Sequence, residues 1–560
     1  MTNADDTLKY EDRVENTKAR LARTSPSLHL LMFIVIFGAA VVGYVAIIWS
    51  GEIRGYQPSK IVAARDLALF VPVLAFFFWL TREQRFRGEM LLLTAAIFLF
   101  TVGLLMQFRL FSDPEYGARG AARSKAREQK AQTVRLLNIE TAYDDEKKTF
   151  MFGSPAAVPK KPGTERLPVY EYSLKDILTS VNTYIPIAAL FAMALGFRLF
   201  RSDKFLLWFQ RHALILGLAT LIPFAIVVLI SQEGKFLGQT TPWEGVKVLF
   251  LLSFAGMLAD SYRHLRRTRW GLPPARYFLP FLVIAAMPVL PFFALSDFGQ
   301  MLVFFGVYLM LYVVAVRKKA QFVYAVVLVA VLFGVFFGAS KATTGFGVPG
   351  RVYFRFYQWI HTWEAPPPDT WWWKRDLERY LQAKNLTLDP SDPQDIKLRN
   401  NEAWADKVLQ QSQGLFGINE GGTIGEGLGL GFPETIPISD SDFIYAALAE
   451  ETGLAGGLAI LIALSAFVFA GTAISIAATD MFTKLVAAGL TAFVGFQAIV
   501  NIGGVLRMLP MTGITLPFVS HGGWSLITSF AMLGILLAFS HRNAVARPVI
   551  REQPRFVPVR

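Results

Sequence analysis

The chain has 560 residues, of which 53% are hydrophobic and only 17% are charged, with a formal net charge of +13. Soluble globular proteins carry roughly a quarter charged residues, so this composition excludes a disordered or fibrous chain and argues against an ordinary soluble enzyme. Cysteine is absent, which excludes disulfides, thiolate metal sites and a cysteine nucleophile. In a membrane protein, excess Lys and Arg usually marks cytoplasmic connections and not nucleic-acid binding.

Long apolar runs are the main structural signal. A bilayer core of about 30 Å needs roughly 20 apolar residues per helix, so the runs predict an all-α polytopic membrane protein with about twelve transmembrane helices. The second run is short. The tenth is long and contains Glu450, Glu451 and Gly453 near its start, so we expect its first turns in the headgroup region or a cavity. The runs lie near 29–50, 67–80, 90–110, 177–199, 209–231, 244–261, 277–295, 298–316, 321–340, 442–475, 482–508 and 524–540.

The connections between these runs predict their orientation. Three even-numbered connections are rich in Arg and Lys, whereas the odd-numbered connections 232–242 and 509–523 carry few cations. The positive-inside rule then places both termini in the cytoplasm, with tails over 1–28 and 541–560. The basic connections are 81–89, 262–276 and 317–319.

Two long connections fall on the outer side in this topology. Residues 111–176 form a basic insertion, which is either a solvated loop or a docking surface for a partner or an anionic polymer. Residues 341–441 contain a Trp-rich patch from Trp359 to Trp373 and end in a glycine-rich run, Gly421 to Gly431. Tryptophans suit a membrane interface.

Ionisable groups inside apolar spans are costly and are therefore functional candidates. Glu244 and Lys247 stand three residues apart at the start of the sixth span, which places them on one helical face. They form either a local ion pair or a charged wall of a cavity. Asp297 lies between the seventh and eighth spans, where a helix N-cap explains it equally well.

Polar residues also mark the C-terminal spans. Gln497 and Asn501 are four residues apart on the eleventh span, where they either join helices by hydrogen bonds or line a site. The connection 510–523 contains two prolines and three glycines, which predicts a shaped, re-entrant loop covered by protein or water.

Two acids precede the long tenth span on the outer side. From spacing alone, Asp442 can equally be explained as an N-cap carboxylate, which the helix dipole favours. Asp440 can be explained as a solvated loop acid.

Six motifs in order resemble the SEDS family of bacterial cell-wall polymerases, which includes RodA, FtsW and SpoVE. The resemblance covers 90–540, with departures at Trp243, Ser296, Gly414, His521 and Trp524. It implies a ten-helix core over 90–540, preceded by an extra helix pair over 29–89 and interrupted by the loops 111–176 and 341–441. The motifs lie at 106–109, 242–247, 296–299, 413–431, 441–453 and 497–523.

The resemblance also implies an activity. A SEDS-like protein is expected to be a peptidoglycan glycosyltransferase that polymerises lipid II at the outer face of the bacterial plasma membrane, for division, elongation or cell shape. Asp442 would be the base that takes the acceptor proton, with Glu244 and Lys247 also catalytic. Substrate-binding roles are expected for Arg355, Asp297, Gln413, Gly421, Gly422, Gln497, Asn501, Ser520, Gly522 and Gly523.

The leaving pyrophosphate needs a cation. Lys247, Arg355 or a divalent metal (Mg or Mn) held partly by Asp442 or Glu244 could supply it. The implied partners are lipid II and a class B penicillin-binding protein that provides transpeptidation, and no nucleic acid.

Three alternatives remain open on the sequence: a lipid II flippase, a different polyprenyl-linked sugar transferase such as an O-antigen ligase, and a scaffold of a cell-wall synthesis complex that has lost catalysis.

Overall fold

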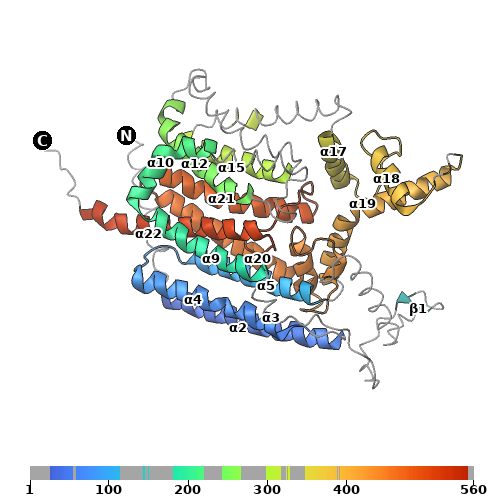
Figure 1. The fold of residues 1–560 in the computed structure, drawn as a ribbon, viewed down its shortest axis with the longest axis horizontal. Coiled ribbons are helices and arrows are strands. Elements are labelled where there is room, and N and C mark those ends of the chain that lie inside the picture. Colours follow the sequence, from blue (N-terminus) through green and yellow to red (C-terminus); the bar gives the residue numbers. More distant parts are fainter. Residues whose placement is uncertain are drawn as a thin grey trace, which may run out of the picture.

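The protein is a bundle of long helices with a smaller helical group at one end (Figure 1). The computed structural model describes residues 26–54, 58–113, 116, 143–144, 149–150, 181–219, 243–266, 298–316, 323, 326–327, 347–387, 389 and 391–552. Strands in these residues are limited to β1 (Tyr143–Asp144), which pairs antiparallel with β2 (Thr149–Phe150).

The helices of the N-terminal half are α2 (Pro26–Ile53), α3 (Lys60–Ala68), α4 (Phe70–Phe78), the π-helical turn η1 (Trp79–Glu83), α5 (Leu91–Ser112), α9 (Val181–Phe200), α10 (Asp203–Ala219) and α12 (Trp243–Leu265). Those of the C-terminal half are α15 (Phe298–Val316), α17 (Gly347–Ile360), α18 (Lys374–Lys384), α19 (Pro393–Gly421), the 3-10 turn η2 (Pro433–Thr435), α20 (Ile444–Ala477), α21 (Met481–Val505) and α22 (Gly523–Glu552).

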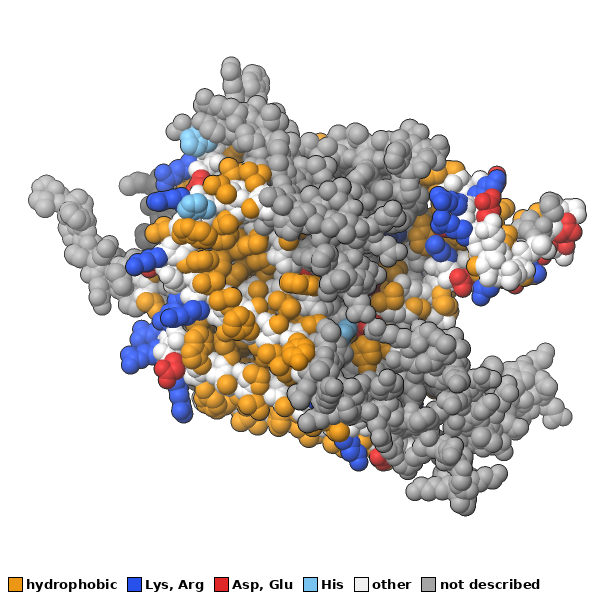
Figure 2. All heavy atoms as spheres, in the orientation of Figure 1, with side chains coloured by type: hydrophobic (Ala, Val, Ile, Leu, Met, Phe, Trp, Pro, Cys, Tyr) orange, Lys and Arg blue, Asp and Glu red, His pale blue; other side chains and the backbone are white. Residues whose placement is uncertain are grey.

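Nine helical segments among the described residues are long and apolar enough to cross a membrane. They match nine of the twelve predicted spans, and the all-α polytopic fold is confirmed. The predicted spans at 209–231, 277–295 and 321–340 lie wholly or partly outside the described residues. A band of apolar side chains lies on the left half of the visible face, and Lys and Arg side chains gather at its left end (Figure 2).

The second span is longer than predicted, because it begins at Lys60 and not at 67. Its charged first turns are accommodated locally. The Arg65 guanidinium pairs with Asp66 at 2.6 Å, and the Tyr44 hydroxyl of α2 donates to the same carboxylate at 3.2 Å. Ion pairing of this kind allows a helix to continue through residues that a hydropathy window rejects.

Helix α21 lies at the centre of the bundle. In its most apolar window 83% of residues are buried, compared with 28% for α2. Helices α20, α15, α12 and α22 pack around α21, while α9 runs along α22 and α2 packs on α5. The helices α2, α3 and α4 therefore form an outer flank next to α5 (Figure 1).

Helix α20 is broken at Gly453, whose φ of 64° and ψ of −164° are not helical. The break exposes backbone groups that must find partners in an apolar setting. The glycine-rich loop after α19 provides them: the amides of Glu426 and Gly427 donate to the carbonyls of Glu450 and Glu451 at 3.0 and 2.9 Å. In return, the Leu454 amide donates to the Gly422 carbonyl at 2.9 Å.

A second, smaller core lies in the group formed by α17, α18 and α19. Trp373 and Trp404 are buried there with Leu377 and Val408, and the Trp373 indole donates to Asn400 at 2.7 Å. The prediction that the Trp-rich patch lies at a membrane interface is therefore wrong for Trp373, because this side chain fills a protein core. Trp363 is exposed.

The connection between α21 and α22 has irregular backbone that is largely buried, as predicted for 510–523. Ile514, Leu516 and Phe518 are each at most 2% exposed. The Phe518 ring packs edge-on against Phe530 of α22, with the centroids 5.5 Å apart. Protein side chains thus cover this loop, which is the condition for non-helical backbone at membrane depth.

We predict that Gly453→Ala lowers the free energy of unfolding by about 1–3 kcal/mol, because a side chain at this φ is strained and its Cβ would collide with the backbone nitrogen of Gly425. Unfolding of the detergent-purified protein measures the change. Gly38→Ala in α2 is the matched control, since its Cβ would meet open space and alanine favours a helix. Equal stability of the two variants would contradict this role for Gly453.

Candidate functional site

Asp442 lies directly before α20, in the turn that follows η2 and leads into the helix. Phe443 occupies the N-cap position, and no side chain caps the helix there. The N-cap explanation of Asp442 is therefore wrong. The half-buried carboxylate of Asp442 does not cap the start of α20 and is therefore available for chemistry.

Short-range contacts fix the backbone and carboxylate of Asp442. The Ser441 hydroxyl donates to Oδ1 of Asp442 at 3.1 Å, and the Asn501 amide donates to the Asp442 carbonyl at 2.9 Å. A Cβ on Gly513 would come within 3.4 Å of Oδ2. The carboxylate thus faces the connection between α21 and α22.

Burial raises the pKa of the Asp442 carboxyl above its usual range. The hydrogen bond from Ser441 and the charge of Arg355 act against this shift, whereas the charge of Asp440 adds to it. A carboxylate with a raised pKa is a stronger base, and its pKa lies nearer the pH at which a general base works.

Two amide side chains of α21 hold the loop beside Asp442. Asn501 also donates to the Ile514 carbonyl at 2.6 Å, and Gln497 donates to the Thr515 carbonyl at 2.9 Å. Their bonds run mainly to loop backbone. These two predicted site residues therefore fold the connection 510–523 over the start of α20.

Ser520 completes this arrangement from the other side of the loop. Its hydroxyl donates to the Ser441 carbonyl at 2.6 Å and accepts from the Leu516 amide at 2.7 Å. Gly522 and Gly523 follow at the start of α22, where a Cβ on Gly523 would lie 2.7 Å from the Ile185 side chain. The structure thus ties Ser520 to Ser441, the residue before Asp442, while Gly523 packs against α9.

Glu244 and Lys247 form a buried ion pair on the first turns of α12. The Gln300 amide donates to Oε1 of Glu244 at 2.9 Å, and the Lys247 ammonium donates to Oε1 of Gln497 at 3.4 Å. The ammonium also lies 4.7 Å from the centre of the Phe493 ring. Gln497 therefore links this ion pair to the loop beside Asp442.

Arg355 of α17 approaches the same loop from the outer helical group. Its Nη1 donates to the Thr512 carbonyl at 3.2 Å, and its charge is near enough to lower the pKa of Asp442. Arg355 is half-buried, whereas Lys247 is only 2% exposed. Of the two predicted cations, Arg355 is the better placed to meet a substrate phosphate.

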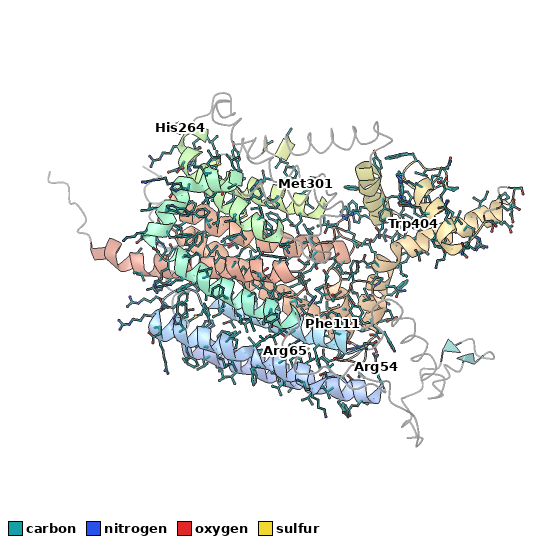
Figure 3. The ribbon with its side chains drawn as sticks, in the orientation of Figure 1. Arg54, Arg65, Phe111, His264, Met301 and Trp404 are labelled. Atoms are coloured by element: carbon teal, nitrogen blue, oxygen red, sulfur yellow. The ribbon has the colours of Figure 1, made fainter. Side chains whose placement is uncertain are left out.

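Asp440 is not the solvated loop acid that the sequence suggested. Tyr116 donates to its Oδ1 at 2.6 Å, and the His521 amide donates to its carbonyl at 2.8 Å. The Phe111 ring, whose residue is labelled in Figure 3, packs against both Tyr116 and His521 at centroid distances of 5.8 and 5.3 Å. Asp440 thus joins Tyr116, which follows α5 in the chain, to the loop before α22.

A buried ionic cluster lies beside the site and was not assigned from the sequence. Arg109 of α5 pairs with Glu451 at 2.7 Å and with Glu434 at 3.1 Å, and its side chain is fully buried. The rule that ionisable groups in apolar spans are functional points to Arg109 and Glu451 singly. Their pairing depends on the break in α20, which sequence periodicity does not show.

The remaining predicted residues fall into three groups. Gly421 packs against Ala449 and Glu450 of α20, and the Gly422 carbonyl accepts the hydrogen bond of the Leu454 amide beyond the break. Protein contacts therefore already account for both glycines. Gln413 is half-buried on α19. Asp297 lies outside the described residues.

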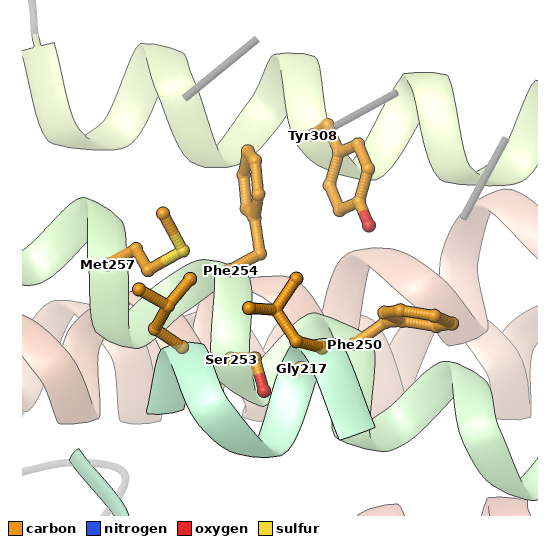
Figure 4. A pocket seen from close by; sticks show the side chains of 8 residues that line it. Gly217, Phe250, Ser253, Phe254, Met257 and Tyr308 are labelled. Carbon is orange, nitrogen blue, oxygen red and sulfur yellow. The ribbon is translucent and has the colours of Figure 1, made fainter. Parts of the chain in front are cut away.

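A small apolar pocket lies between α10, α12 and α15 (Figure 4). Leu214, Phe250, Phe254 and Tyr308 are among its lining residues, with Ser253. None of its lining residues belongs to the Asp442 cluster, so this pocket is separate from the candidate site.

Among the described residues, no three Asp, Glu or His side chains converge in a way that would hold a metal ion. Glu244, one of the two proposed ligands, is already engaged by Lys247 and Gln300. The described donors therefore do not fit a metal held by Glu244.

We predict that Glu244→Gln and Lys247→Met each destabilise the protein by about 3–5 kcal/mol, because each leaves the other charge buried without a partner. The double variant should lose less than the sum of the two. Unfolding of the detergent-purified variants measures this coupling. Additive losses would contradict a direct pairing.

Comparison with known proteins covers mainly the C-terminal part of the chain. Residues 394–544 match the model of the FtsW/RodA/SpoVE family, described as cell cycle proteins. Over 143 residues the chain is 43% identical to the peptidoglycan glycosyltransferase RodA of Mycobacterium tuberculosis, which is 26% of this chain and 30% of that protein. Over 142 residues it is 38% identical to the stage V sporulation protein E of Bacillus subtilis, 24% of this chain and 39% of that protein.

Solved structures are similar at lower identity. One, described as "Structural coordination of polymerization and crosslinking by a peptidoglycan synthase complex", is 23% identical with a TM-score of 0.43 and covers 66% of this chain and 91% of its own. The rod shape determining protein RodA of Thermus thermophilus is 20% identical with a TM-score of 0.34, covering 64% and 88%. The matched stretches span only about a third of the curated relatives. Residues 394–544, which include Asp442, Asn501 and Ser520, match the FtsW/RodA/SpoVE family model, and the resemblance to the SEDS proteins is confirmed over that stretch.

Proposed function

We propose that this protein is a peptidoglycan glycosyltransferase that polymerises lipid II into glycan strands. The observation that carries the proposal is the Asp442 carboxylate. It is half-buried, it is not used as a helix cap, and its pKa is raised by burial. The family match and the curated relatives named peptidoglycan glycosyltransferase support this choice.

In the proposed reaction, Asp442 takes the proton from the 4-hydroxyl of the incoming GlcNAc. The hydroxyl oxygen then bonds to the anomeric carbon of the donor chain, and the bond from that carbon to the undecaprenyl pyrophosphate breaks, with inversion. The base thus ends protonated, and the leaving group takes the electron pair of the broken bond. A positioned general base contributes about 10²–10⁴-fold to such a rate.

Arg355 is the residue that we assign to the leaving pyrophosphate. A guanidinium binds phosphate oxygens through paired N–H donors, and Arg355 is near Asp442 yet half-buried. Glu244, Lys247 and Gln497 then hold the loop that bears Thr512, to which Arg355 donates. No step of the proposed reaction passes through a metal.

The setting that we propose is the bacterial plasma membrane, with both termini in the cytoplasm and Asp442 at the outer face. The basic connections of the sequence support this orientation. A glycan strand must be cross-linked after it is made, so we propose a class B penicillin-binding protein as the partner, as the SEDS resemblance implies. Division, elongation and cell shape are all compatible roles.

We predict that Asp442→Asn lowers polymerisation by about 10²–10⁴-fold, the share that a general base supplies. Glycan strands formed from lipid II by the detergent-purified protein are measured on a gel. Asp440→Asn is the matched control, two residues away, and should still make strands.

The outcome separates the proposal from two of its rivals, the flippase and the scaffold. Without a membrane to cross, a flippase makes no strands in detergent, and a scaffold makes none with either variant. Wild-type activity of Asp442→Asn would rule out Asp442 as the base.

We predict that Asp440→Asn moves the acidic limb of the polymerisation rate to lower pH. The Asp440 charge raises the pKa of Asp442, so removing it lowers that pKa. The base then stays ionised, and active, to a lower pH. Rates from acidic to neutral pH test this sign, and a shift to higher pH would contradict it.

A further inference from the structure

The N-terminal helix α2 reaches the segment that leads to Asp442. Arg54, the residue after α2, donates through Nη2 to the carbonyls of Leu430 and Gly431. Its Nη1 lies 3.5 Å from Oε1 of Glu434, and its guanidinium carbon lies 4.4 Å from the centre of the Phe432 ring. The Arg54 side chain thus contacts four of the five residues from 430 to 434.

The backbone of the same segment also packs directly on α2. A Cβ on Gly429, whose φ is 84°, would collide with the Ser50 hydroxyl and lie 3.5 Å from the Ile47 Cα. This contact is independent of Arg54. The helix and the glycine-rich loop are therefore fitted to each other along the end of α2.

Charge balance gives Arg54 a further role. Glu434 and Glu451 are buried and pair with two guanidinium groups, Arg54 and Arg109. A third buried carboxylate, Glu450, accepts from the Phe432 amide of the same segment. The Glu434 side chain is 1% exposed. Without Arg54, Arg109 alone would serve both Glu434 and Glu451 and a buried negative charge would lack compensation, which strongly disfavours the arrangement.

The segment 430–434, which Arg54 contacts, is followed by a short and well-packed stretch of chain that leads to Asp442. After Glu434 the chain passes through Ile436, which is fully buried, and then the amides of Ser441 and Phe443 both donate to the Ile438 carbonyl. On its other side the loop is fixed to the break in α20. A displacement at 430–434 therefore reaches Asp442 or must be absorbed within this short turn.

We propose that Arg54 is a positioning residue for the polymerisation reaction: it holds residues 430–434 and thereby sets the place of Asp442. This inference rests on the proposed function. Residues 26–83 lie outside the segment 394–544 that matches the family, so the N-terminal helices supply a part of the site that the matched segment lacks.

Arg54→Gln tests the inference, with Arg65→Gln as the matched control. Both arginines flank the same helix connection, their side chains are 16% and 17% exposed, and each pairs with a carboxylate that is at most 3% exposed. Figure 3 shows Arg54 at the end of α2 and Arg65 further from that end, on the helix that follows. Arg65 pairs with its neighbour Asp66 and not with the loop.

Two measurements are made on the full-length protein in detergent. The first is the kcat and KM of strand formation from lipid II. The second is hydrogen exchange at the amides of Glu426, Gly427 and Gly429, which donate to Glu450 and Glu451 just before the break in α20. For Arg54→Gln we expect kcat to fall at least about tenfold, since a displacement of about 1 Å can cost 10²-fold, and these amides to exchange faster.

Arg65→Gln should change neither quantity. Arg54→Lys should recover part of kcat, because an ammonium can pair with Glu434 but lacks the planar fork that binds two carbonyls. The same loss of kcat in Arg65→Gln, or an unchanged kcat in Arg54→Gln when the wild type is active, would overturn the inference alone. A wild type that makes no strands overturns the proposed function, and the exchange data then separately report whether Arg54 holds the loop.

Discussion

The break in α20 at Gly453 is the constraint on which the rest of the site depends. A helix that stops inside an apolar bundle leaves carbonyls and amides that no water can satisfy. The glycine-rich loop meets this demand by exchanging backbone hydrogen bonds with both sides of the break. Glu451, on the turn before the break, is neutralised by Arg109 of α5. The helix that begins just after Asp442 is thereby tied to α19 and α5.

A second piece of irregular backbone, the connection from α21 to α22, faces the first. Asn501 and Gln497 hold it from α21, and Ser520 ties it to the residue before Asp442. The carboxylate therefore sits between two non-helical segments, each fixed by side chains of regular helices. The helices supply a rigid frame, and the two irregular segments place the carboxylate between them. Such support favours a reactive group that is held in one place.

Much of this could be predicted from the sequence. Apolar run length predicts the spans, and ionisable residues within them point to Glu244 and Lys247, because burying a charge without purpose is costly. What the sequence could not predict are pairings between distant segments, such as Arg109 with Glu451 or Tyr116 with Asp440. These depend on three-dimensional register. The capping explanation of Asp442 failed for a local reason: the helix starts one residue later than the spacing suggests, with Phe443 at the cap. The role expected for Gly421 and Gly422 was substrate binding, whereas their described contacts are with protein backbone.

The paired hydrogen bonds just before the break in α20 also bear on which changes of chain length this part of the protein can accommodate. Because the amides of Glu426 and Gly427 meet the carbonyls of Glu450 and Glu451, the stretch between them is a closed ring of chain. Adding or deleting a residue within that ring shifts Asp442 relative to the break. A change of chain length outside the ring leaves these hydrogen bonds in register, whereas a change inside it does not, so the ring behaves as one structural unit.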